Sequence, residues 1–374
     1  MKKTAPCHQR WIPFVLLASV VTALAWAGAS PALAQGSKPL TPMQFAAATP
    51  NPNPLFINIE IGKVLGFYAE EGIDASFLYA TANAAVTILI DQGKSQVGVG
   101  TSNFQVSYAA QGHKLPGINF YEYAAPLKWD IATAPDAPYS SIAQLKGKNL
   151  GIVGRGTADE NVAKSFLELS GVKASDVNFI VVGQGSPGGV ALKQGQIDAM
   201  LAWDTTLGQW EVAGIGYKLL PRPKNLKPVG GFFIQAKPEF IRDHRALAVG
   251  FGRAVAKATV FALANPRAAA DAYLKLHPIA AGQGKSRADT IDSIVKIVAK
   301  RAVHWLHEGK DYTNPKDLLG EMYLQEWKNE LEFADAVDKV KDPQIFFTNE
   351  LIKEINDFDR QAVIAKAKAY KIQP

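Results

Sequence analysis

The sequence predicts an α/β protein built from two lobes, followed by an all-helical C-terminal part packed on the first lobe. From residue 41 to about residue 236, short apolar runs alternate with amphipathic segments, which is typical of α/β folds with mostly parallel strands. From Pro238 onward this strand pattern stops and the apolar residues follow a helical period. The length of 374 residues suits two units that each bury a core.

The composition is that of a globular protein, with 48% apolar and 20% charged residues. The formal net charge of +6 falls to +3 when the basic residues Lys2, Lys3 and Arg10 of the N-terminal segment are left out. Because the remaining excess is small and scattered along the chain, it does not predict a nucleic-acid-binding surface. We therefore expect no nucleic-acid partner.

The N-terminal segment, residues 1–34, has the pattern of an export signal. Its basic start is followed by an apolar run from Ile12 to Ala29 and by the small-residue sequence Ala32-Leu33-Ala34. An uncleaved membrane anchor is the alternative, because the apolar run is nearly long enough to span a bilayer. The abrupt change to polar residues at Gln35 favours cleavage near Ala34. The sequence thus predicts a signal peptide and a periplasmic protein.

Nine strands and five C-terminal helices are expected from the periodicity. The expected strands are Met43–Ala47, Ala75–Tyr79, Gln96–Gly100, Ile118–Tyr123, Ile131–Ala134, Asn149–Val153, Asn178–Val182, Ile197–Trp203 and Phe232–Gln235. The expected C-terminal helices are Leu247–Ala264, Ala268–Leu276, Ser286–Leu306, Asp317–Ala334 and Asn349–Ala369.

A weak internal repeat relates residues 66–106 to residues 165–208. Gln92-Gly93 matches Gln194-Gly195, and each pair closes a helix and leads into a strand. These strands end at equivalent positions, Gly100-Thr101-Ser102 and Ala202-Trp203-Asp204. The repeat predicts two similar lobes whose strand-end loops face a shared cleft.

Three of these loops have the residues of a ligand site. Ligands in open parallel sheets bind beyond the carboxyl ends of strands, where helix N-termini present free N–H groups. The candidate residues in the three loops are Thr101 and Ser102, then Arg155, Gly156 and Thr157, and finally Trp203 and Asp204. The alternative is that the hydroxyl and carboxyl residues are plain helix caps, that Arg155 is a solvated surface charge and that Trp203 is core.

The turn at Asn53 and Pro54 is a further candidate, with a purely structural turn as the alternative. No catalytic constellation is present: the only cysteine is Cys7, and no Gly-x-Ser-x-Gly or His-Glu-x-x-His motif occurs. His304 and His307 are spaced i, i+3, but this spacing alone does not predict a metal site. We therefore assign no catalytic residue, no metal and no cofactor, and we expect that the protein is not an enzyme.

Four stretches carry a resemblance to a known family. They are residues 62–74 (Gly-Lys-Val-Leu-Gly-Phe-Tyr-Ala-Glu-Glu-Gly-Ile-Asp), residues 92–100, residues 142–152 with their Leu-Lys-Gly-Lys core, and residues 192–199 followed by Trp203. In combination they resemble the periplasmic solute-binding proteins of ABC importers, in the nitrate/sulfonate/taurine and thiamine-precursor groups. The resemblance spans about residues 41–270, and the cysteine-rich motif of the yeast thiamine-precursor relatives is absent.

The resemblance implies a two-lobed periplasmic-binding-protein fold of type II. Lobe one would combine residues 35–127 with residues 232–374, and residues 128–231 would form lobe two. The family's binding positions carry over to Asn53/Pro54, Thr101/Ser102, Gly156/Thr157 and Trp203/Asp204. A hinge near Gly230-Gly231 would let the two lobes close on the ligand.

The function implied is capture of a small organic anion, a sulfonate or carboxylate with aromatic ones included, for a membrane permease. An anionic ligand is predicted because several helix N-termini and Arg155 would attract negative charge. The candidates for an apolar wall are the aromatic residues Phe56, Tyr79, Phe104, Tyr108, Trp129, Trp203 and Phe232. The alternatives are a neutral pyrimidine ligand of the thiamine-precursor type, a periplasmic enzyme on the same fold, and an adaptor for a sensory receptor. We expect a monomer.

Overall fold

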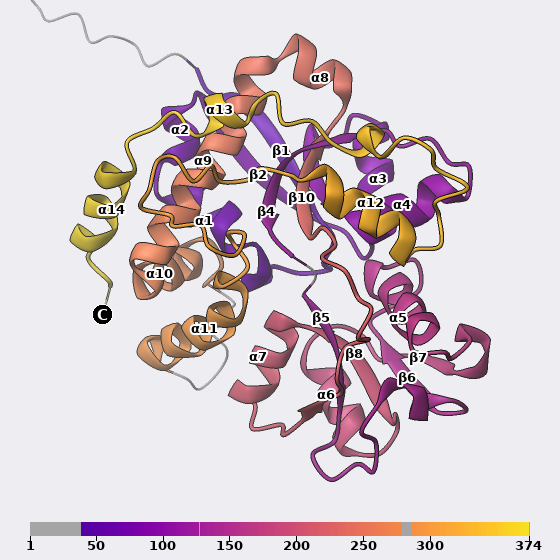
Figure 1. The fold of residues 1–374 in the computed structure, drawn as a ribbon. Helices are drawn as coiled ribbons and strands as arrows, with labels where there is room; N and C mark the ends of the chain where they lie inside the picture. The colour runs from indigo at the N-terminus through magenta and orange to yellow at the C-terminus, as the bar shows by residue number, and fades with distance from the viewer. Residues whose placement is uncertain (1–38, 127, 279–285, 374) are drawn as a thin grey trace, which may run out of the picture. The chain divides into compact units, whose positions relative to one another are not determined.

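The computed structural model describes residues 39–126, 128–278 and 286–373, drawn as a ribbon in Figure 1. The predicted signal peptide, residues 1–34, lies outside these residues. The first sheet has the order β2-β1-β3-β10-β4, with β1 (Thr41–Ala47), β2 (Ile73–Tyr79), β3 (Val97–Thr101), β4 (Ile118–Ala124) and β10 (Phe232–Ala236). The second has the order β7-β6-β8-β5-β9, with β5 (Trp129–Thr133), β6 (Asn149–Ile152), β7 (Asn178–Val181), β8 (Ala199–Trp203) and β9 (Lys218–Leu219). We call the parts built around these sheets lobe one and lobe two.

The two sheets follow one plan, as the internal repeat predicted. In each, the first strand lies between the second and the third, and one inserted strand separates the third from the fourth. The inserted strands are β10 in lobe one and β5 in lobe two, and both run antiparallel to their two neighbours. The other four strands of each sheet run in one direction, so the expectation of mostly parallel strands is confirmed. β5 and β10 each follow a crossover from the other lobe, so they enter their sheets from the opposite end.

Helices follow the corresponding strands of both lobes. Lobe one has α1 (Ile57–Val64), α2 (Phe67–Glu70), α3 (Asn83–Asp91) and α4 (Ser102–Ala110), and lobe two has α5 (Ala158–Leu169), α6 (Ser186–Lys193) and α7 (Asp204–Val212). The expected strands are all present, with ends that differ by at most two residues. β9 was not expected, because two residues carry no readable period.

The C-terminal part is helical but more interrupted than the sequence suggested. Its helices are α8 (Pro238–Asp243), α9 (Arg245–Ala264), α10 (Pro266–Leu276), α11 (Arg287–Ala302), α12 (Leu324–Phe333), α13 (Ile352–Ile355) and α14 (Arg360–Ala369). The helix expected from residue 317 begins only at Leu324, because Gly320 has a φ of +81° and packs where a Cβ would collide with the Tyr121 ring. The helix expected over 349–369 is two helices, and Asp359 caps the second by accepting from the Ala362 N–H.

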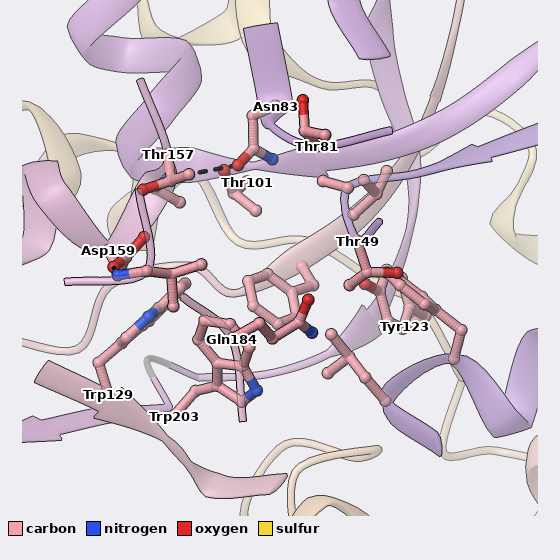
Figure 2. A pocket seen from close by; sticks show the side chains of 17 residues that line it. Thr49, Thr81, Asn83, Thr101, Tyr123, Trp129, Thr157, Asp159, Gln184 and Trp203 are labelled. Atoms are coloured by element: carbon pink, nitrogen blue, oxygen red, sulfur yellow. Dashed lines mark hydrogen bonds between the residues drawn. The ribbon is translucent and has the colours of Figure 1, made fainter. Parts of the chain in front are cut away.

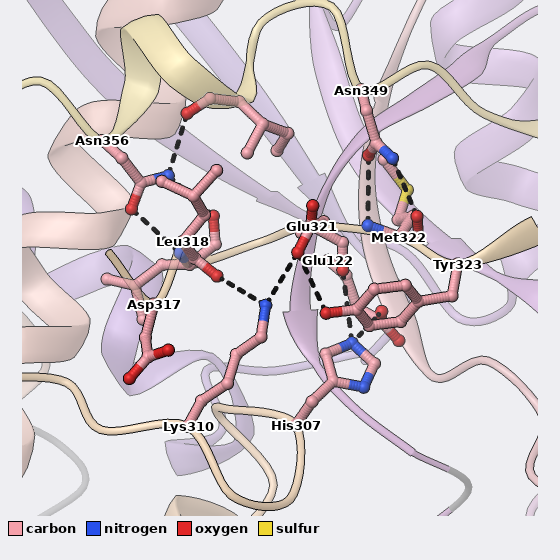
Figure 3. A network of polar contacts seen from close by, with 12 residues as sticks. Glu122, His307, Lys310, Asp317, Leu318, Glu321, Met322, Tyr323, Asn349 and Asn356 are labelled. Atoms are coloured by element: carbon pink, nitrogen blue, oxygen red, sulfur yellow. Dashed lines mark hydrogen bonds and ion pairs between the residues drawn. The ribbon is translucent and has the colours of Figure 1, made fainter. Parts of the chain in front are cut away.

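Polar side chains fasten the loops of this C-terminal part, as Figure 3 shows. Lys310 pairs with Glu321 at 2.9 Å, and the Tyr323 hydroxyl donates to the same carboxylate. The Asn349 side chain makes two hydrogen bonds with the backbone of Met322, and the Asn356 side chain makes two with the backbone of Leu319. The side-chain amides thus replace the regular backbone hydrogen bonds that these loops lack.

Within the described residues, α9 is the one helix long and apolar enough to cross a membrane, and most of it is buried inside the protein. It packs against α1, α10 and α14. Phe251 of α9 stacks on Phe45 of β1 with ring centroids 6.0 Å apart. Its apolar surface is therefore covered by the core of lobe one.

The two crossovers between the lobes touch each other. One joins β4 to β5 and the other leads from β9 to β10. The Glu122 carboxylate of β4 accepts a hydrogen bond of 3.0 Å from the Gly231 N–H, and Lys128 donates to the Ala124 carbonyl at 2.7 Å. A Cβ on Gly231 would collide with the Ala124 carbonyl and the Lys128 ammonium. Glycine is needed here because the crossovers approach so closely.

Candidate functional site

A small pocket lies where the strand ends of the two lobes face each other (Figure 2). Its cavity measures about 50 Å³. The lining residues come from both lobes and are Ala48, Thr49, Leu55, Phe56, Thr81, Asn83, Val99, Thr101, Tyr123, Trp129, Val153, Thr157, Ala158, Asp159, Gln184, Trp203 and Phe232. This is the shared cleft that the internal repeat predicted.

Lobe one supplies hydroxyl and amide groups together with two phenyl rings. Thr49 and Thr81 follow β1 and β2, and Thr101 ends β3. Asn83 begins α3, and its side-chain oxygen accepts from the Ala158 N–H of lobe two at 3.3 Å. This hydrogen bond joins the lobes at the rim of the pocket.

Lobe two supplies two indole rings and a side-chain amide. Trp129 of β5 and Trp203 of β8 are paired in register across the antiparallel ladder, so their side chains lie on the same face of the sheet. The Trp129 ring meets Phe232 edge-on with centroids 5.0 Å apart. Gln184 follows β7, just before α6. Together these groups form an apolar wall with N–H groups at its edges.

Five polar atoms of the lining are buried and have no hydrogen-bond partner among the described residues. They are the Thr101 and Tyr123 hydroxyl oxygens, the indole nitrogens of Trp129 and Trp203, and the Gln184 amide nitrogen. An indole N–H and an amide NH₂ can only donate. Since a buried donor without an acceptor costs about 1–3 kcal/mol, the pocket is suited to a molecule that brings acceptor atoms.

Asp159 is the only carboxyl group among the described residues of the lining. Its side chain accepts a hydrogen bond of 2.7 Å from the Val153 N–H. Burial raises the pKa of Asp159 to about 6, against the hydrogen bonds with Thr157 and the backbone, which lower it. No lysine or arginine lines the pocket among the described residues.

Three of the nine residues expected to bind ligand line the pocket, namely Thr101, Thr157 and Trp203. The structure brings them together from the end of β3, the residue before α5 and the end of β8. Of the aromatic residues proposed for the wall, Phe56, Trp129, Trp203 and Phe232 are in place, whereas Tyr79, Phe104 and Tyr108 are not. Phe104 and Tyr108 stack on each other with centroids 5.5 Å apart on α4.

The other six expected residues are placed outside the lining. Asn53 caps the short helix Pro54–Phe56 by accepting from the Leu55 N–H. This contact fits the alternative of a purely structural turn. Gly156 has a φ of +69° and donates its N–H to Glu160 at 3.0 Å. The Gly156 N–H is therefore taken up by a side chain of the first turn of α5.

Arg155 also differs from its expected role. Its guanidinium pairs with Glu160 at 2.9 Å and lies over the Phe179 ring, 5.7 Å from the centroid. The side chain is 59% exposed. Glu160 lies in the first turn of α5, and this exposed pair leaves Arg155 outside the lining of the pocket. The expectation of a cation in the site is corrected accordingly.

Ser102 and Asp204, the first residues of α4 and α7, are held by the C-terminal helices. The Ser102 hydroxyl donates to Glu330 at 2.7 Å. Asp204 accepts from Arg301 through both carboxylate oxygens, at 2.5 and 2.7 Å. Their partners come from α12 and α11, which are more than ninety residues away in the sequence, so local motifs carried no signal for either pair.

The residues that sequence reasoning missed are mostly single polar residues placed just after strands. Thr49, Thr81 and Gln184 follow β1, β2 and β7 in this way. Applying the internal repeat to every strand end, rather than to β3 and β8 alone, would have found them. Tyr123 and Asp159 carry no such signal, because nothing in their local sequence separates them from core or cap residues.

A cluster of ionisable groups lies beside the crossovers. His307 faces Glu122 at 3.0 Å through Nε2 and Glu326 at 3.5 Å through Nδ1. Burial lowers the pKa of His307, but the hydrogen bond and charge of Glu122 outweigh it, so the pKa is raised. These three residues have ligand atoms within 4.8 Å of one another. Each ring nitrogen of His307 thus faces one of the two carboxylates.

The comparisons with known proteins agree with this architecture. The sequence profile described as "NMT1/THI5 like" matches residues 53–269. A protein from Bordetella bronchiseptica has a similar structure at 22% identity and a TM-score of 0.66, covering 84% of this chain and 97% of its own. None of the curated protein sequences matches this chain.

Two further solved structures are named by what they bind. The periplasmic aliphatic sulphonate binding protein SsuA from Escherichia coli is similar at 15% identity and a TM-score of 0.60, covering 82% of this chain and 92% of its own. The alkanesulfonate-binding protein SsuA from Xanthomonas axonopodis pv. citri, bound to MOPS, is similar at 13% identity and a TM-score of 0.57, covering 84% and 97%. At these identities the likeness shows the two-lobed periplasmic-binding-protein fold. Since the family profile matches more than half of the chain, this protein belongs to the NMT1/THI5-like family.

Proposed function

We propose that this protein is the extracytoplasmic solute-binding component of an ABC importer and that it captures a small organic anion by closure of its two lobes. The observation that carries the proposal is the set of buried, unpartnered donors around one apolar pocket between the lobes. Trp129, Gln184 and Trp203 present N–H groups from lobe two, and Thr101 presents a hydroxyl from lobe one. A sulfonate or carboxylate supplies acceptor oxygens for these groups and an apolar body for the aromatic wall.

The size of the pocket limits the ligand. The cavity of about 50 Å³ is well below the roughly 150 Å³ of an apolar cavity that binds benzene. A short aliphatic sulfonate or carboxylate therefore needs less rearrangement than an aromatic one. An aromatic acid requires the lobes or the indole rings to move apart, and its affinity reports how easily they do so.

A neutral heterocycle of the pyrimidine type is the second candidate ligand. It is favoured by the presence of Asp159 and by the lack of a cation among the described lining residues. A ring nitrogen would accept from an indole N–H, and an exocyclic amine would donate to the Asp159 carboxylate. Two indoles also provide faces for ring stacking.

The remaining parts of the proposal follow from this role. Lobe boundaries near residues 128 and 231, export by a cleaved signal peptide, a periplasmic location, a monomeric state and delivery to a permease are predictions. The family resemblance and the fold support delivery to a permease over capture for a sensory receptor. An enzyme would have to work with Asp159 and Tyr123, the only ionisable side chains in the described lining.

Titration calorimetry with a small panel of solutes tests the proposal. The panel contains methanesulfonate, butanesulfonate, benzoate, nitrate and an aminopyrimidine. We expect the alkanesulfonates or carboxylates to bind most tightly and Gln184→Ala to weaken that binding about tenfold through one lost hydrogen bond to a charged group. Arg155→Ala is the matched control and should leave the affinity unchanged.

Preferential binding of the aminopyrimidine would select the second ligand. Absence of binding by every solute, or a loss of affinity in Arg155→Ala with none in Gln184→Ala, would overturn the assignment of this pocket. Nitrate binding as tight as that of the sulfonates would show that the apolar wall has no part in recognition.

A further inference from the structure

The C-terminal helices α11 and α12 both contact lobe two, although the C-terminal part packs chiefly on lobe one. α11 lies along α7, and α12 reaches α5. In the view of Figure 1, α7 lies beside α11 at the left of lobe two, and α5 lies below α12 at its right. Lobe two is thus contacted by the C-terminal part on two sides.

α11 is fixed to lobe one near its beginning and to lobe two near its end. At the first end, Arg287 binds the buried Asp271 of α10 at 2.6 Å. At the other end, Lys300 pairs with Glu211 of α7 at 2.8 Å. The helix therefore connects one element of each lobe through separate ion pairs.

The buried pair of Arg301 and Asp204 is the strongest of these connections. The Arg301 side chain is fully buried and holds Asp204 of lobe two in a bidentate contact. The same guanidinium lies 4.8 Å from the centroid of Phe232, which belongs to β10 of lobe one and lines the pocket. Arg301 thus touches both lobes directly behind the ligand site.

The backbones of α7 and α11 also pack closely. A Cβ on Gly208 of α7 would lie 2.9 Å from the Ile297 Cα of α11. Since backbone atoms cannot move aside as a flexible side chain does, only glycine allows this approach. On the other side of lobe two, Phe333 of α12 meets Phe166 of α5 edge-on at 5.9 Å, and Asn329 donates to the Pro228 carbonyl at 2.6 Å.

We propose that α11 and α12 form an interlobe brace that holds lobe two in the closed position when no solute is bound. The inference rests on the proposed function only in assuming that the lobes can move apart. With the brace in place, the closed form is the resting state. Opening requires α7 to leave α11 and α5 to leave α12, so the cleft opens rarely and solute exchange is slow.

Distances between spin labels measure this directly. Cys7 is the only cysteine in the sequence, so a Cys7→Ser background accepts new labels cleanly. One labelled pair, Ile88→Cys with Val190→Cys, joins exposed sites on α3 and α6 of the two lobes. A second pair, Val190→Cys with Val303→Cys, joins lobe two to the exposed residue after α11.

Two variants remove the brace from either side. Gly208→Ala places a methyl group against α11 while improving the helix propensity of α7. Phe333→Ala removes the contact with α5. The control for the first is Gly250→Ala in α9, where the Cβ would be equally crowded, at 2.9 Å from Glu71, but where no contact between lobes is involved. If Gly208→Ala does not fold, Lys300→Glu replaces it, because it reverses the charge in the half-exposed ion pair with Glu211 of α7. Its control is Arg245→Glu, which reverses the charge in an ion pair with Glu350 that does not involve lobe two.

Without added solute, we expect a single short distance for both pairs in the wild type and in the controls. Gly208→Ala and Phe333→Ala should each shift the distribution to longer distances, and the double variant further. Unchanged distances in folded Gly208→Ala and in the double variant would overturn the brace. So would a lengthening of the 88–190 distance alone, because α11 would then travel with lobe two. Failure of every solute to bind in calorimetry is a separate result that concerns only the proposed function.

Discussion

Equivalent positions of the two lobes are stabilised in different ways, by a hydrogen bond in lobe one and by an ion pair in lobe two. Ser102 and Asp204 both open the helix that follows the third strand of their sheet, and both are buried against a residue of the C-terminal helices. In lobe one the partner is the Glu330 carboxyl, whose burial raises its pKa to about 8. In lobe two a carboxylate is paired with a guanidinium.

The comparison shows that one backbone plan tolerates two solutions for the same buried polar site. A hydroxyl can be satisfied by a neutral carboxylic acid, whereas a carboxylate needs a cation because burial of an unpaired charge is far more costly. Lobe two is therefore joined to α11 by the Asp204–Arg301 ion pair, whose loss would leave a buried charge. Lobe one is joined to α12 through Glu330, whose carboxyl group titrates.

The largest effect is expected when the charged pair is broken. Arg301→Met leaves Asp204 buried without its cation and should lower the free energy of unfolding by about 3–5 kcal/mol. Urea unfolding followed by circular dichroism measures it. Lys300→Met, which breaks the half-exposed pair with Glu211 one residue earlier, should cost about 1 kcal/mol or less. Equal losses in the two variants would contradict the distinction between the lobes.

A smaller loss is expected on the lobe-one side. Ser102→Ala removes the hydroxyl that donates to Glu330 and should cost about 1–3 kcal/mol, the cost of a buried polar atom left without its partner. The same urea titration applies. A loss as large as that of Arg301→Met would mean that Glu330 is charged in the folded protein.

The pocket offers a similar contrast between the lobes. Its unpartnered N–H donors all come from lobe two, whereas the unpartnered groups of lobe one are the Thr101 and Tyr123 hydroxyls. Gln184→Ala should therefore weaken an acceptor-rich ligand more than Thr101→Val does, by a factor of about ten against a factor of about three. Calorimetry with the tightest solute of the panel compares them. The reverse order would place ligand recognition in lobe one.

The smallest effect concerns the pH dependence of stability. The folded pKa of Glu330, about 8, lies above the ordinary value of 4.5, so its stabilising contribution is complete below pH 4.5 and is lost as the pH rises through 8. Glu330→Gln cannot titrate. The Tm of Glu330→Gln minus the Tm of the wild type should accordingly increase from pH 5 to pH 9. Parallel Tm profiles would show that Glu330 does not titrate in this range.

Periodicity was sufficient to predict the strands, because buried strands such as β3 and β8 are short apolar runs bounded by glycine and polar residues. It carries no information on the direction of β5 and β10, since direction depends on which lobe the chain comes from. Trp203 and Thr101 could be predicted from their places at strand ends. Asp159 and Tyr123 could not, and Arg155 was misplaced because its partner Glu160 lies in the same helix turn that was thought to bind the anion.

The contact between the two crossovers has a mechanical consequence. The Glu122 carboxylate accepts from the Gly231 N–H across the two crossovers, and the Lys128 side chain fills the space between them. The two segments are therefore mechanically coupled. A rotation of lobe two would turn both segments together about a common axis. Sideways sliding and independent bending would break these contacts. If lobe two moves, these contacts therefore favour a movement in which both crossovers turn together.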